Sequence, residues 1–354
     1  MSRGSVFSVA AAATVLAGVL LALLPATPAS AHGGATPAGT DYRSRLVAVK
    51  PEVSGLHLRV VQDGAHLELR NKTGREVMVL GYSGEPYLRI TPEGVDVNTR
   101  SPAAYVNKTI DGRTAPPKDA DADAEPSWRR QSSEPVARWH DHRAHWMEAG
   151  SPPAVQDDPH SAHRISTWTV DLVADGTTVK ATGTLDYLPP PAAPVWWAGM
   201  LVAAGAVALL GRWRHGLPVL GAALAVAGAA ELADGIGRTI EEGATGIGAL
   251  GALLTSETYG TLTALTALAA AVLAVRRSPV APFALALAAV CLAVLGGLTD
   301  VGVFSHALAP VPWAPELARL CTAAAIAVPA GVAVAGWLRV RADRPAPVAA
   351  PAAS

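Results

Sequence analysis

Two hydrophobic patterns divide the chain. Between residues 41 and 189, short segments alternate apolar and polar residues with a period of two, which is typical of strands with one buried face. The alternating segments are residues 45–49, 56–61, 66–70, 76–80, 165–173 and 177–187. Asp175-Gly176 lies between the last two and is a strong hairpin signal. We therefore expect an all-β, antiparallel sandwich-like domain over residues 32–187.

The second pattern begins after a proline-rich linker at residues 188–194 and consists of long apolar runs. Each run is long enough to cross a bilayer as a helix. We expect five spans, at residues 195–211, 217–233, 258–275, 281–303 and 315–338. The region 195–338 is thus predicted to be an α-helical transmembrane bundle, with the bilayer as its first partner. The glycine-rich segment 234–257 leaves open a broken or re-entrant helix.

The first 31 residues have the pattern of a signal peptide: Arg3, an apolar stretch at 9–24, and Ala29-Ser30-Ala31 as a cleavage site. An uncleaved anchor helix is the alternative. Cleavage after Ala31 makes His32 the mature N-terminus.

Basic residues indicate the orientation of the spans. They follow the first, third and fifth spans, at Arg212, Arg214, His215, Arg276, Arg277, Arg339, Arg341 and Arg344. Because basic loops stay in the cytoplasm, we expect a plasma-membrane protein with residues 32–194 outside. The tail 339–354 is then cytoplasmic, and its proline and alanine content predicts disorder.

Polar segments and composition narrow the function. Residues 111–135 lack the strand pattern and contain an acidic, proline-bearing run, so we expect a mobile surface loop there. A net charge of −1 gives no reason to expect nucleic acid. Both cysteines, Cys291 and Cys321, lie in apolar runs, so no disulfide framework supports the exported part. His57 and His66 are expected on the solvated face of their strands.

The densest group of potential ligand atoms is the nine-residue stretch Trp139-His140-Asp141-His142-Arg143-Ala144-His145-Trp146-Met147. His140 and His142 would share a face in an extended segment, and His142 and His145 would share one in a helix. Imidazole is a preferred ligand of copper and zinc. Met147 offers a soft ligand for Cu(I), and Asp141 could orient an imidazole. His160 and His163 are further candidates. The alternative is a tryptophan-anchored loop with no ion.

A histidine at the mature N-terminus offers its imidazole and its α-amino nitrogen to one ion, the arrangement called a histidine brace. His32 and the predicted β-sandwich resemble exported copper-resistance carriers and copper monooxygenases in this respect. We therefore expect copper, with zinc as the second choice, at His32 together with His142 or His140.

The layout of the whole chain is more similar to a group of uncharacterised membrane proteins of high-GC Gram-positive bacteria with an exported β-domain. This resemblance implies no established activity. The residues that carry it are Asn71-Lys72-Thr73-Gly74, Gly84-Glu85-Pro86-Tyr87-Leu88, the stretch from Trp139 to Met147, and Gly183-Thr184-Leu185.

Ionisable residues near the outer ends of the spans form a second group. Glu231, Asp234, Asp300 and His306 are the candidates for a cation site at the membrane face. The alternative is that these residues are hydrated or paired at the interface.

Three classes of function follow from these features. We favour a membrane-anchored copper-binding protein for uptake, delivery or resistance, working with other copper-handling envelope proteins. A structural or interaction module of the cell envelope is the second hypothesis. A membrane metalloenzyme is the third, and it is the least favoured because the sequence has neither G-x-S-x-G nor H-E-x-x-H.

Overall fold

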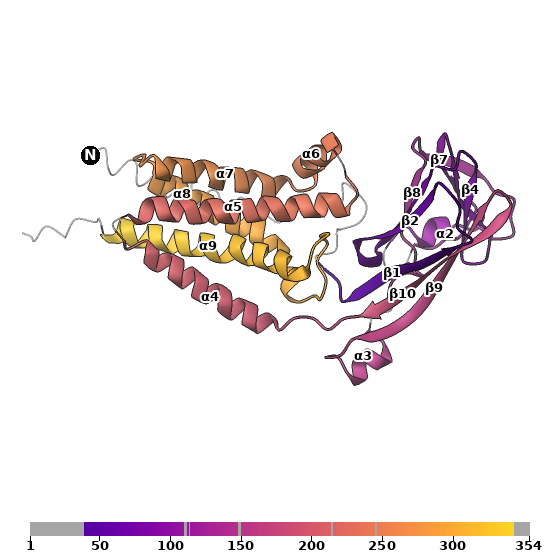
Figure 1. The fold of residues 1–354 in the computed structure, drawn as a ribbon, viewed down its shortest axis with the longest axis horizontal. Coiled ribbons are helices and arrows are strands. Elements are labelled where there is room, and N and C mark those ends of the chain that lie inside the picture. The colour runs from indigo at the N-terminus through magenta and orange to yellow at the C-terminus, as the bar shows by residue number, and fades with distance from the viewer. Residues whose placement is uncertain are drawn as a thin grey trace, which may run out of the picture.

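The computed structural model describes residues 39–109, 112, 114–147, 150–213, 215–244 and 246–342. Ten strands form the first domain (Figure 1). They are β1 (Tyr42–Lys50), β2 (Leu56–Val61), β3 (His66–Asn71), β4 (Val77–Leu80), β5 (Pro86–Thr91), β6 (Gly94–Asn98), β7 (Trp128–Ser132), β8 (Val136–Trp139), β9 (His163–Ala174) and β10 (Thr177–Tyr187). Three short helices complete it: η1 (Gln62–Gly64), α2 (Ala103–Val106) and α3 (Pro153–Asp157).

The strands form two antiparallel sheets, which confirms the predicted fold class. The larger sheet has the order β1-β10-β9-β4-β5-β6-β7 and the smaller has the order β2-β3-β8. Both contribute to one apolar core, in which Leu67 and Trp139 from the small sheet pack with Val79, Trp168 and Leu172 from the large one. The hairpin predicted at Asp175-Gly176 joins β9 to β10.

One strand lies within the segment predicted to be a loop. β7 occupies residues 128–132 and pairs with β6 at the edge of the large sheet. Its residues do not alternate between apolar and polar, because an edge strand whose faces are largely exposed does not have to bury a row of apolar side chains. Its Arg130 instead pairs with the buried Asp96, at 3.0 Å. The prediction of a mobile surface loop at 111–135 was therefore wrong for residues 128–132, which form β7.

Five helices are long and apolar enough to cross a membrane, which confirms the predicted number of spans. They are α4 (Ala193–Leu210), α5 (Gly216–Glu241), α7 (Thr258–Val275), the broken helix made of α8 (Ala281–Cys291), η2 (Leu292–Gly296) and η3 (Gly297–Phe304), and α9 (Pro315–Ala342). The chain is accordingly a multi-pass membrane protein with a β-domain.

The second and fourth spans depart from the simplest reading of the sequence. α5 continues to Glu241, eight residues beyond the predicted end at 233, and a separate short helix, α6 (Gly246–Thr255), follows it. The sequence left open whether residues 234–257 form a broken or re-entrant helix. In the structure, residues 234–241 continue α5 without a break, and α6 is the one separate helix among the described residues of this segment. The fourth span changes from α-helix to a π-turn at η2 and then to a 3₁₀ segment at η3.

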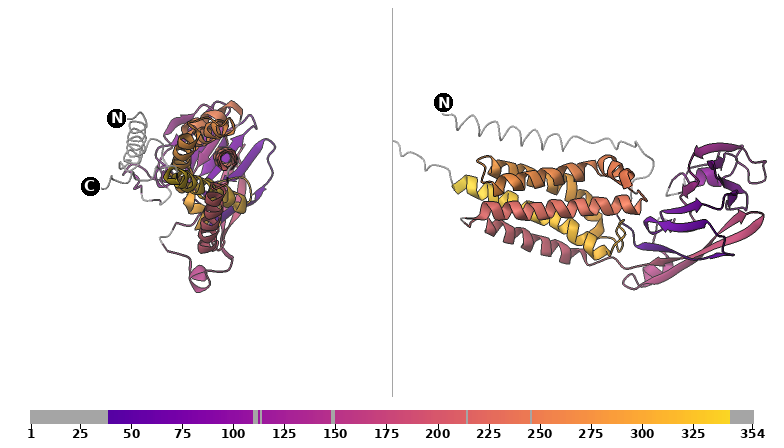
Figure 2. Two further views of the ribbon diagram at one scale, coloured as in Figure 1. Left: turned by 90° about the vertical axis from the view of Figure 1, so that its left-hand side faces the viewer. Right: turned by 45° about the horizontal axis from the view of Figure 1, so that its top comes forward.

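The β-domain lies against one end of the helical bundle (Figures 1 and 2). Gln62 N, in η1, donates to Glu241 Oε1 at 2.9 Å, and Arg138 Nη2 donates to the carbonyl of Glu242. On the other side, Ala307 N donates to Asp41 Oδ1 at 2.7 Å. The end of α5 and the segment after η3 therefore fix the β-domain to the bundle at two places.

Candidate metal centre

The side chain of Asp141 shapes the loop that follows β8. Its fully buried carboxylate accepts hydrogen bonds from Trp139 Nε1 at 2.9 Å, Arg143 N at 3.1 Å and Arg143 Nε at 2.8 Å. An aspartate that binds the backbone two residues later closes a tight turn. Ala144 N then donates to the Asp141 carbonyl at 2.9 Å. This turn brings the side chains on either side of it together.

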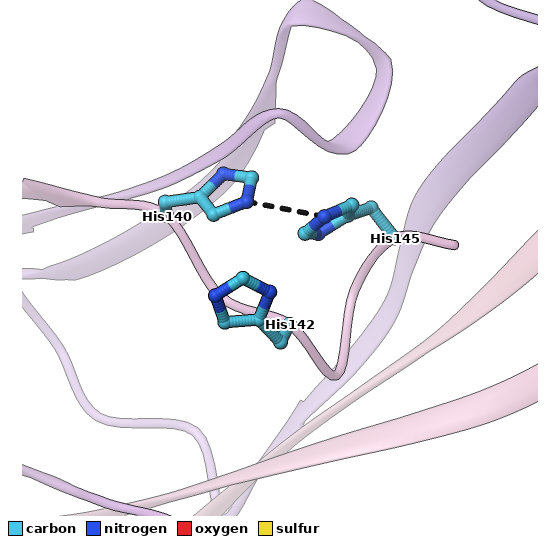
Figure 3. A group of neighbouring side chains, drawn as sticks. All are labelled: His140, His142 and His145. Atoms are coloured by element: carbon cyan, nitrogen blue, oxygen red, sulfur yellow. Dashed lines mark hydrogen bonds between the residues drawn. The ribbon is translucent and has the colours of Figure 1, made fainter. Parts of the chain in front are cut away.

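Three histidines converge at this turn. One ring nitrogen each from His140, His142 and His145 lies within 4.8 Å of the others (Figure 3). His140 Nε2 and His145 Nε2 are 3.1 Å apart. Among the described residues, no other group of three histidine, cysteine, aspartate or glutamate side chains is placed to hold a metal ion.

Backbone carbonyls hold the second nitrogen of each ring. His140 Nδ1 faces the Ala65 carbonyl, His142 Nε2 faces the Val106 carbonyl at 2.9 Å, and His145 Nδ1 faces the Asp141 carbonyl at 3.3 Å. A carbonyl only accepts hydrogen bonds, so a ring nitrogen that is bonded to one is the donor, and the opposite nitrogen is the candidate ligand. The candidate ligand nitrogens are therefore His140 Nε2, His142 Nδ1 and His145 Nε2.

The short distance between His140 Nε2 and His145 Nε2 has a chemical consequence. The hydrogen bond between them needs a proton on one of the two nitrogens, and the ring tautomers decide which one carries it. A metal ion bound by both rings would take the place of that proton. The third candidate ligand nitrogen, His142 Nδ1, contacts Met147 Sδ, which places a thioether beside the three imidazoles.

Burial keeps His140 and its neighbour His66 uncharged at neutral pH. Desolvation, followed by the electrostatic effect of His145, lowers the pKa of His140 to about 4. Desolvation, together with the charge of Arg138, also lowers the pKa of His66 to about 4. Neutral imidazole is the form that binds metals, so His140 needs no deprotonation at neutral pH.

His66 is the neighbour that the sequence did not indicate. Its ring meets the ring of His140 edge-on, with centroids 5.8 Å apart, and its Nδ1 faces Gln62 Oε1 at 3.1 Å. The expected position on a solvated face was wrong for His66, which is half-buried. The pairing of Leu67 with Trp139 brings His66 opposite His140, and only the pairing of β3 with β8 could have revealed this.

The remaining candidates are placed differently. Asp141 does not orient an imidazole through its carboxylate, because Trp139 and Arg143 occupy it; only its carbonyl faces His145. His163 Nε2 faces the Asp158 carbonyl, and His160 is exposed, so neither joins the three histidines. His32, like the whole predicted signal peptide, lies outside the described residues.

The four membrane-face candidates do not form one site. Asp234 and Asp300 both pair with Arg238, at 2.9 and 2.8 Å, and Glu231 lies nearby on the same helix, α5. His306 instead faces Asp41 of the β-domain, at 3.4 Å. Arg238 was not singled out from sequence, although its i, i+4 spacing from Asp234 was a usable signal.

The fold and the centre together define a multi-pass membrane protein whose β-domain carries a cluster of three histidines. Comparisons with protein-family models, curated proteins and solved structures find no match to this chain.

Proposed function

We propose that the protein binds a copper ion through His140, His142 and His145 and acts in copper uptake, delivery or resistance at the cell surface. The observation that carries the proposal is the direction of the three rings. Each gives one nitrogen to a backbone carbonyl and turns the other toward the cluster. A hydrogen bond from the second ring nitrogen to a carbonyl is the usual support of a metal-bound histidine.

The donor set favours copper over other divalent ions. Three imidazole nitrogens suit copper and zinc, and copper is bound more tightly at nitrogen sites. The thioether of Met147 would be a soft ligand for Cu(I), whereas thioethers are not among the usual ligands of zinc. The β-domain sequence contains no cysteine, which disfavours a zinc–thiolate site.

The proposed orientation places the β-domain outside the cell. Arg339 Nε donates to the Gly211 carbonyl at 2.6 Å, so the basic residues after the first and fifth spans share one end of the bundle. The β-domain lies at the opposite end (Figure 1). Because basic ends remain in the cytoplasm, this arrangement supports an exterior β-domain.

A metal titration of the full-length protein in detergent tests the proposal. The apoprotein is titrated with Cu(II) and followed by EPR, and Cu(I) affinity is measured by competition with a chromophoric chelator. The test variant combines His140→Ala, His142→Ala and His145→Ala. The matched control combines His160→Ala and His163→Ala, which removes histidines of the same domain that lie outside the cluster.

We expect one copper per chain with nitrogen hyperfine structure in the wild type and the control. The triple variant should lose at least about 100-fold in affinity, since outer partners of a ligand alone are worth 10- to 100-fold. Copper binding by the triple variant at wild-type affinity would contradict the proposal and favour an interaction module without a metal. A variant with one residue added before His32 tests whether the N-terminus contributes the brace expected from sequence.

A further inference from the structure

A buried group of charges lies within the helical bundle, apart from the histidine cluster. Asp234 and Arg238 on α5 and Asp300 on η3 are linked by contacts of 2.9 and 2.8 Å through the guanidinium of Arg238. The side chains of Asp234 and Arg238 are 3 and 7% exposed. Asp234 Oδ1 has no hydrogen-bond partner among the described residues.

Glu231, one turn before Asp234 on α5, is the unpartnered member of this group. It is 7% exposed, and among the described residues it makes no hydrogen bond or ion pair. Two glycines make room for its carboxyl group: a Cβ at Gly260 or Gly296 would lie 2.6 or 2.8 Å from Glu231 Oε1. The carboxyl therefore fills a space between α7 and the π-turn of the fourth span, where helix geometry is already broken.

The charges of this group do not balance. Glu231, Asp234 and Asp300 supply three negative charges if all are ionised, and Arg238 supplies one positive charge, which leaves a net charge of −2. Two other titratable side chains lie near Glu231: the carboxyl of Glu257 and the thiol of Cys321 on α9. An uncompensated carboxylate inside a membrane bundle is strongly unfavourable.

A metal ion is not the ligand that this geometry suits. Among the described residues, only the three histidines bring three potential ligand atoms into range of one ion, and the carboxylates around Arg238 do not. Arg238 also occupies the space between Asp234 and Asp300 that a cation would need. A proton requires only one oxygen and no coordination shell.

We propose that Glu231 is a proton-binding site in the membrane domain, holding a proton on its carboxyl group while Arg238 neutralises Asp234 and Asp300. Glu231 lies ten residues before Glu241, the residue that contacts η1, which is roughly 15 Å along the helix. The site is thus inside the bundle but near the end that carries the β-domain. It does not depend on metal binding by the histidines.

Labelling with dicyclohexylcarbodiimide tests the proposal, because this reagent attacks protonated carboxyl groups in apolar surroundings. The full-length protein in detergent is labelled over a series of pH values, digested, and mapped by mass spectrometry. We expect the label on Glu231, a loss of label as the pH is raised, and none on Glu316, which is exposed at the start of α9. Excess NaCl or Cu(I) should not protect Glu231. An unlabelled Glu231, or protection by either cation, would overturn the proposal.

A comparison of two variants tests the charge state without any reagent. Glu231→Gln replaces a neutral acid with a neutral amide of the same shape, so we expect the Tm to stay unchanged at neutral pH. Asp300→Asn is the matched control; it takes an anion away from Arg238 and should lower the Tm. If Glu231→Gln changes the Tm in either direction by as much as Asp300→Asn does, then Glu231 is ionised and the proposal is wrong.

Discussion

The ion pair between Asp141 and Arg143 should control the stability of the histidine loop. Asp141 is fully buried, and Arg143 donates to it from its backbone N, its Nε and its Nη2. Asp141→Asn keeps the size of the side chain but removes its charge and turns an amide N–H₂ toward one of these donors. The guanidinium of Arg143 is then left without its anion.

The structure sets the size of this effect. Removing one partner of a buried ion pair costs about 3–5 kcal/mol. The lower end applies here, because the Arg143 side chain is 21% exposed and keeps hydrogen bonds to the carbonyls of Leu80 and Gly81, at 3.2 and 3.4 Å. A loss of about 3 kcal/mol in the free energy of local opening corresponds to amide exchange that is faster by more than about 100-fold.

Hydrogen exchange of the full-length protein, read by mass spectrometry on peptides covering residues 136–147, measures this opening directly. Asp175→Asn is the matched control, because Asp175 also pairs with an arginine, Arg75, but both side chains are about two-thirds exposed. An exposed pair contributes at most about 1 kcal/mol, so exchange near Asp175 should change less than about fivefold. A change of less than about fivefold in the histidine loop of Asp141→Asn would refute the stabilising role of this pair.

Two further predictions concern the contact between the domains and the orientation of the spans. The hydrogen bond with Asp41 raises the pKa of His306 above its ordinary value of 6.5. The protonated imidazole should therefore stabilise the contact fully below pH 6.5, and this stabilisation should be lost as the pH rises through the raised pKa of the folded protein. Exchange protection at residues 40–42 should therefore fall between acid and alkaline pH in the wild type and stay flat in His306→Gln; equal profiles would exclude the effect. Alkaline phosphatase fused after Arg212 should be inactive, and the same enzyme fused after Ser305 should be active; the reverse pattern would invert the proposed topology.

The sequence predicted best the elements that bury one face, such as the strands, or that are apolar on all sides, such as the membrane spans. The alternation in β9 and β10 predicted their hairpin, because every second residue faces a core. The apolar runs predicted all five spans, since the bilayer requires a minimum length of apolar helix. The clustering of His140, His142 and His145 could be anticipated because a loop of six residues cannot carry their side chains far apart.

Long-range pairing could not be predicted in the same way. The position of His66 beside His140 depends on the register of β3 against β8, two strands separated by more than 60 residues. The polar strand β7 is held by Asp96 and by the sheet edge rather than by its own apolar face. Arg238 pairs with Asp300 from another helix, and nothing in the local sequence of either residue indicates that partner.

The support of the histidine rings by backbone carbonyls has an evolutionary consequence. The Ala65 and Val106 carbonyls can be supplied by almost any amino acid, provided that the backbone keeps its path. Substitutions at these positions can therefore accumulate over long divergence without turning the rings away. Descendants of this protein could retain the centre with identity at only the few residues of one loop, and a search for distant relatives should weight that loop above the strands around it.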